Sequence, residues 1–134
     1  MITIIAAIIT FLLLDGIWLG LIGTQWYVQG FGKLMQMSES GSIQPYWPAA
    51  IIVYIALIAG ILFFVVPKAQ GNIWHGLFWG MLFGFVTYAT YDFTNLSVLK
   101  DWQWKISIID TCWGIVLCGV TSMVTVFVSN LTNN

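Results

Sequence analysis

The sequence predicts an all-α membrane protein, in which four transmembrane helices form one compact bundle. The first observation is composition: the 134-residue chain is 60% hydrophobic and 7% charged, whereas soluble domains carry about 25% charged residues. The second is a mean hydropathy of +0.92. The third is length, because four segments each supply about 20 mainly apolar residues, enough to cross a bilayer. The net charge of −1 and the lack of arginine leave no basic surface for nucleic acid.

We predict spans at about residues 2–23, 47–66, 73–96 and 104–128 of a single domain that covers residues 1–134. The first span contains one charged residue, Asp15, and lacks both a basic leader and a small-residue cleavage site, so we expect it to be retained. In the second span Pro48 suits the first helical turn, and Pro67 is expected to end the helix. Tyr54 is its one polar side chain, and this span is expected to face lipid.

Between the first two spans we predict a short helix that lies in the membrane interface. Tyr27, Phe31, Leu34 and Met35 fall on one face of such a helix. A second loop before the last span, residues 100–105, carries tryptophan and lysine, which are typical of the headgroup level.

The third span carries small residues at a regular spacing. Gly76, Gly80 and Gly84 recur at every fourth position, and the same step leads to Tyr88 and Asp92. A four-residue step keeps one helix face, and small residues at this spacing let a second helix approach closely in lipid. Asp92 is therefore expected to face protein, and the glycines could also join two copies of the chain in a homo-oligomer.

Three carboxylates lie inside predicted spans, namely Asp15, Asp92 and Asp110. An ionised aspartate at the centre of a membrane helix costs about 2.5 to 3.5 kcal/mol on insertion scales, so each needs a partner, water or a proton. With a rise of about 1.5 Å per residue, all three lie within roughly 12 Å of the same membrane surface. We predict that they converge in one partly wet chamber.

Aromatic and polar residues lie within about one turn of these acids. The predicted ligand-binding set is Asp15, Trp18, Tyr88, Tyr91, Asp92, Asn95, Asp110 and Trp113. An alternative is structural, because single polar residues in spans often only join helices by hydrogen bonds. In that case Asp92 and Asn95 would form a cap at the end of the third span.

Several kinds of chemistry lack the residues they need. His75, the one histidine, lies about 25 Å along the helix axis from Asp92, so it cannot pair with the acids. We therefore predict no metal site and no cofactor, and no Ser-His-Asp set can be assembled. Cys112 and Cys118 are expected to be helix-packing residues.

Three strings resemble a known family. They are D-x-x-W-L-G-L from Asp15 to Leu21, G-x-x-x-G-x-x-x-Y-x-x-Y-D-x-T-N-L from Gly80 to Leu96, and D-x-x-W-G from Asp110 to Gly114. Together they resemble a bacterial family of small integral membrane proteins catalogued as a domain of unknown function (number two-one-seven-seven). The resemblance covers nearly the whole chain, and the second string is its specific part. It implies a multi-pass protein of the bacterial inner membrane and brings no activity with it.

Three functions fit these residues. The first is binding or transport of a cationic or amphipathic small molecule, because acids supply charge and aromatic faces attract cations. Proton coupling is suggested here, since clustered carboxylates disfavour simultaneous ionisation. The second is a lipid-modifying enzyme whose acids serve as general acid and base. The third is an accessory subunit whose acids bind the spans of a partner.

Overall fold

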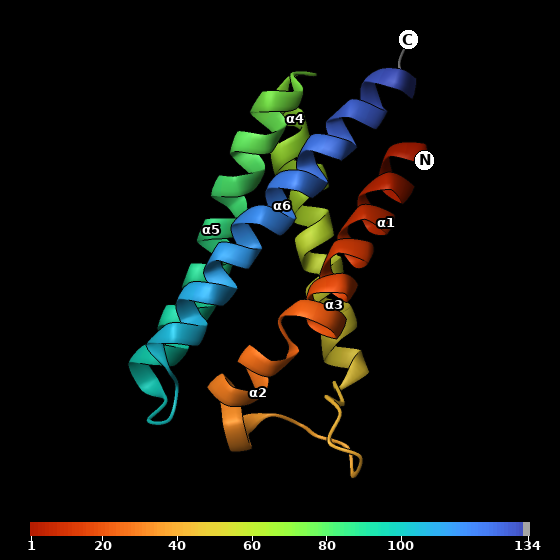
Figure 1. Cartoon of the computed structure of the whole chain (residues 1–134). Helices are drawn as coiled ribbons and strands as arrows, with labels where there is room; N and C mark the ends of the chain where they lie inside the picture. The colour runs from red at the N-terminus through yellow and green to blue at the C-terminus, as the bar shows by residue number, and fades with distance from the viewer. Residues whose placement is uncertain (133–134) are drawn as a thin grey trace.

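The computed structural model describes residues 1–132, apart from the side chain of Lys33. Within that range the chain is helical, and one isolated antiparallel bridge joins Met37 and Ile43. The elements are α1 (Ile2–Ile17), the π-helix η1 (Trp18–Ile22), α2 (Thr24–Phe31), the 3₁₀ turn η2 (Gly32–Leu34), α3 (Trp47–Gly60), the π-helix η3 (Ile61–Val65), α4 (Val66–Ala69), α5 (Ile73–Val98) and α6 (Trp104–Thr132). Long segments run alternately in opposite directions, so both termini lie at one end of the molecule and α2 at the other (Figure 1).

Within residues 1–132, three helical segments are long and apolar enough to cross a membrane. They are Ile2–Ile22, Trp47–Ala69 and Trp104–Thr132. Helix α5 has 26 residues, which is sufficient length, but it is not among the three. Its sequence is rich in glycine, threonine and tyrosine, which lowers its mean hydropathy. The all-α class is therefore confirmed, and the fourth span stays a prediction.

Helix α5 and helix α6 pack against each other along most of their length. The reason is the glycine stripe of α5: Gly76, Gly80 and Gly84 are all buried. A Cβ atom built on Gly80 would lie 2.6 Å from the carbonyl oxygen of Cys118, and one on Gly84 would lie 2.1 Å from that of Gly114. The stripe thus contacts α6 of the same chain, so association of two copies through these glycines would require α6 to move away.

The second segment departs from expectation at its end. Pro67 was expected to end the helix, but the helix continues to Ala69, and Gln70 then adopts a positive φ of 51°. The π-helix η3 immediately precedes Pro67, which occupies the first turn of α4. A proline is tolerated in a first turn because its missing N–H has no obligatory partner there.

The apolar core lies where α1, η3 and α6 meet. Its buried members are Ala7, Phe11, Ile58, Ile61, Leu117 and Cys118. Phe11 lies about one turn from Asp15 along α1, and Phe11 has no exposed surface. The core therefore borders the carboxylates on the side of the chain termini.

We predict that Gly84→Ala destabilises the protein by about 1–3 kcal/mol, the usual cost of overpacking. The added methyl group would meet a backbone carbonyl, which cannot rotate away. The measurement is the free energy of unfolding in mixed detergent micelles. Gly16→Ala is the matched control, because no atom lies within 4 Å of its Cβ position; it should be neutral or stabilising by up to about 1 kcal/mol from helix propensity. Equal effects of the two substitutions would contradict the packing described.

Candidate functional site: carboxylates at one end of the bundle

The three membrane aspartates lie towards the end of the bundle that carries α2. Asp15 is near the end of α1, Asp92 near the end of α5, and Asp110 near the start of α6. All three are buried, with exposures of 6%, 0% and 9%. Their surroundings differ, and the differences suggest different roles.

Asp15 accepts two hydrogen bonds from neutral donors on two other helices. The Tyr54 hydroxyl of α3 donates to Oδ2 at 2.8 Å, and Trp113 Nε1 of α6 donates to Oδ1 at 3.1 Å. The Trp113 indole also stacks on Trp18, with ring centroids 4.5 Å apart and planes at 5°. The Asp15 carboxylate thereby connects α1, α3 and α6.

Asp110 accepts a hydrogen bond from the Tyr27 hydroxyl of α2 through Oδ1. Tyr27 accepts in turn from Trp18 Nε1 at 2.9 Å. Gly23 makes this series of hydrogen bonds possible, because a Cβ atom at that position would lie 2.9 Å from both Trp18 Nε1 and Tyr27 Cε2. Burial, together with the negative charge of Asp110, raises the pKa of Tyr27, so the phenol remains a donor at any physiological pH.

Asp92 is the exception among the three. It is fully buried between α5 and α6, and neither carboxyl oxygen has a hydrogen-bond partner. The side chains of Asp110 and Thr111 are its neighbours on α6, and two ionised carboxylates can only accept hydrogen bonds, so neither can satisfy the other. Thr111 Oγ1 is likewise buried without a partner.

Two adjoining cavities open between α3 and the α5–α6 pair. One has a volume of about 230 Å³ and the other about 350 Å³. Both are lined by Val53, Leu57, Tyr88 and Asp110, and we call them together the acidic cleft. The remaining lining residues are Asp15, Leu19, Tyr27, Ala50, Tyr54 and Trp113 on the first cavity, and Thr87 and Tyr91 on the second.

The structure places most of the predicted set around this cleft. Its lining includes Asp15, Tyr88, Tyr91, Asp110 and Trp113. Tyr88 is held by Gly114, because a Cβ atom on that glycine would lie 2.2 Å from the tyrosine ring. Tyr91 is 56% exposed and makes an edge contact with Trp102.

Three members of the set lie outside the lining. Trp18 stacks on the ring of Trp113. Asp92 is buried between α5 and α6, and Asn95 is half-buried about one turn beyond it. The expectation of a single chamber for three acids therefore needs refinement. Asp15 and Asp110 line the cleft, whereas Asp92 does not line it and lies beside Asp110.

Sequence reasoning missed two residues that hold the acids. Tyr54 was expected to face lipid with the rest of its span, and Tyr27 was placed only on an interfacial helix face. Both donate hydrogen bonds to aspartates. The sequence could have indicated a role for Tyr54, because a lone hydroxyl in an otherwise apolar span needs a hydrogen-bond partner. Nothing in the sequence indicated which acid each tyrosine would bind.

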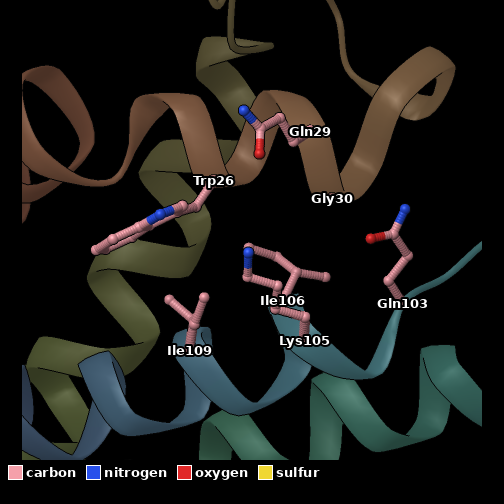
Figure 2. Close-up of a pocket in the computed structure, with 7 residues that line it drawn as sticks. All are labelled: Trp26, Gln29, Gly30, Gln103, Lys105, Ile106 and Ile109. Carbon is pink, nitrogen blue, oxygen red and sulfur yellow. The ribbon is translucent and has the colours of Figure 1, made fainter.

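A separate, smaller cavity of about 70 Å³ lies between α2 and the first turns of α6. Figure 2 shows its lining, in which the Trp26 ring from α2 and the Lys105 side chain from α6 extend into the space between the two helices. The described residues that line it include no carboxylate. A cation would therefore prefer the acidic cleft.

These features define the class: a multi-pass helical membrane protein with carboxylates buried among its helices. The chain belongs to the family DUF2177, described as a predicted membrane protein, whose model matches residues 1–127. This agrees with the family indicated by the three sequence strings. No curated protein and no solved structure matches the chain.

We predict that Tyr27→Phe destabilises the protein by about 1–3 kcal/mol, because Asp110 would lose a donor while staying buried. Tyr46→Phe removes the same atom from a side chain that is 65% exposed, and it should leave stability unchanged. Thermal unfolding in detergent compares the two variants. A Tyr27→Phe protein as stable as the Tyr46→Phe protein would exclude a structural contribution from this hydrogen bond.

Proposed function

We propose that the protein binds a cationic, amphipathic small molecule in the acidic cleft. The observation that carries this proposal is that two buried carboxylates, Asp15 and Asp110, line one cavity and receive hydrogen bonds from neutral groups alone. Among the residues that the structure describes, the lining of the cleft contains no lysine or histidine. Neutral donors lower the cost of burying a carboxylate but leave its charge uncompensated, so a ligand cation there gains Coulomb energy in a low dielectric.

The aromatic lining suits the same ligand. Tyr88, Tyr54 and Trp113 line the cavity beside the acids. An aromatic face can attract a desolvated cation by about 2 kcal/mol. Val53 and Leu57 supply apolar surface on the opposite side, which favours a molecule with both a charge and an apolar part.

The size of the cleft favours a small molecule. Ligand sites commonly have volumes of roughly 300–1,000 Å³, and the larger cavity alone has about 350 Å³. Access from the bilayer is supported by α3, whose first half is largely uncovered, with Ile52 67% and Val53 52% exposed. An amphipathic ligand could thus enter sideways from lipid.

The proposal includes α5 as a fourth span. Its low hydropathy comes in part from the glycines that it buries against α6, and a helix packed along a membrane span shares that span's environment. The protein would then be a four-span protein, and the family resemblance supports the bacterial inner membrane as its location. Passage of the ligand across the membrane would require the core around Phe11 and Leu117 to open.

One observation favours a second candidate, a lipid-modifying enzyme. The cleft borders lipid through the exposed half of α3, so a lipid headgroup could reach Asp110 and act as substrate for general acid–base catalysis. Mass-spectrometric lipid profiles of a deletion strain and its complemented strain test this candidate. Identical profiles would remove it.

We predict that tetraphenylphosphonium, an amphipathic cation, binds the purified protein in detergent and changes its tryptophan fluorescence. Trp113 contacts Asp15 directly, so the change should report the cleft. Asp15→Asn should weaken binding by at least about tenfold, equal to about 1.4 kcal/mol, because one of the two attracting charges is lost.

Asp101→Asn is the matched control for that experiment. It removes the same charge from an exposed loop position and should leave the dissociation constant unchanged. The proposal fails if wild type does not bind the cation, or if Asp15→Asn and Asp101→Asn bind it equally well.

A further inference from the structure

The Asp92 side chain does not line the cleft, and its oxygens have no hydrogen-bond partner among the described residues. It lies on the glycine face of α5, one turn beyond Tyr88, and none of its surface is exposed. Both of its oxygens lack a partner. A buried carboxylate in this condition carries a desolvation penalty.

The titratable groups around Asp92 are acids and phenols. Asp110 faces it from α6, and Tyr91 approaches it from its own helix. Behind Asp110 lie Tyr27 of α2 and Asp15 of α1. Among the described residues, the groups around this pair include no lysine and no histidine.

Two ionised carboxylates side by side in a dry site repel each other strongly, and interacting acids of this kind take up protons as a pair. A proton on one carboxyl removes the repulsion and supplies the donor that the other lacks. We infer that Asp92 and Asp110 share one proton, and that binding of a cation in the acidic cleft releases it. This inference rests on the proposed function.

The two members of the pair differ in access. Asp92 is sealed between α5 and α6, whereas Asp110 lines both cavities of the cleft. The cation acts on the pair through Asp110, and the proton leaves through the same carboxyl into the cleft and then to water. One positive charge enters and one proton departs, so the net charge of the site is unchanged. Asp92 serves as the partner that keeps the proton available, and it does not touch the ligand.

The test measures proton release when tetraphenylphosphonium is added to the purified protein in weakly buffered detergent solution with a pH indicator dye. Wild type should release up to one proton per bound cation. At pH values where the Asp92–Asp110 pair still holds its proton, raising the pH by one unit should lower the dissociation constant by up to tenfold. Asp92→Asn leaves Asp110 without a second carboxyl. It should abolish proton release and flatten the pH dependence, while Asp101→Asn should behave as wild type.

A second readout uses wild type alone, in case Asp92→Asn does not fold. Infrared difference spectra should show loss of the protonated carboxyl C=O band on addition of the cation. The inference of a shared proton is wrong if the cation binds without proton release or without loss of this band. It is also wrong if proton release persists in Asp92→Asn. In each of these cases the proposed function still holds. Absence of cation binding in wild type removes both proposals together.

Discussion

The close contact between α5 and α6 is the constraint on which the rest of the structure depends. Gly76, Gly80 and Gly84 allow the backbones to approach so closely that a Cβ atom on Gly80 or Gly84 would meet a carbonyl oxygen of α6. In lipid there is little hydrophobic force between helices, so such van der Waals packing holds them together. The contact fixes Asp92 against Asp110 and leaves α3 to cover only part of the remaining surface, which creates the cleft.

Hydrogen bonding around the acids shows how the chain tolerates charge in an apolar setting. Tyr54 and Trp113 donate hydrogen bonds to Asp15, and Tyr27 donates one to Asp110, so each of these two carboxylates is bound from other elements. A lysine in place of one of these donors would have compensated one of the negative charges. Because the donors are neutral, they connect the helices without cancelling the negative charge of Asp15 and Asp110. The proposed function depends on this remaining negative charge at the cavity.

The sequence predicted much of this arrangement because the relevant physics is local. Apolar segments of sufficient length predicted the helices to within a few residues, and the rise per residue placed Asp15, Asp92 and Asp110 towards one end. Hydrogen-bond partners far apart in sequence could not be predicted in the same way. Tyr54 lies 39 residues from Asp15, and Tyr27 lies 83 residues from Asp110. Whether Asp92 faces the cleft or the α6 interface depends on helix rotation, which a four-residue step does not resolve.

The most direct test of the central claim compares two ions of nearly the same shape and opposite charge. Equilibrium dialysis of tetraphenylphosphonium and tetraphenylborate against the protein in neutral detergent, corrected for micelle partitioning, gives both dissociation constants. An acidic, aromatic cleft should bind the phosphonium and exclude the borate. Equal binding of both ions, or binding of the borate alone, would show that the carboxylates of Asp15 and Asp110 do not define the site.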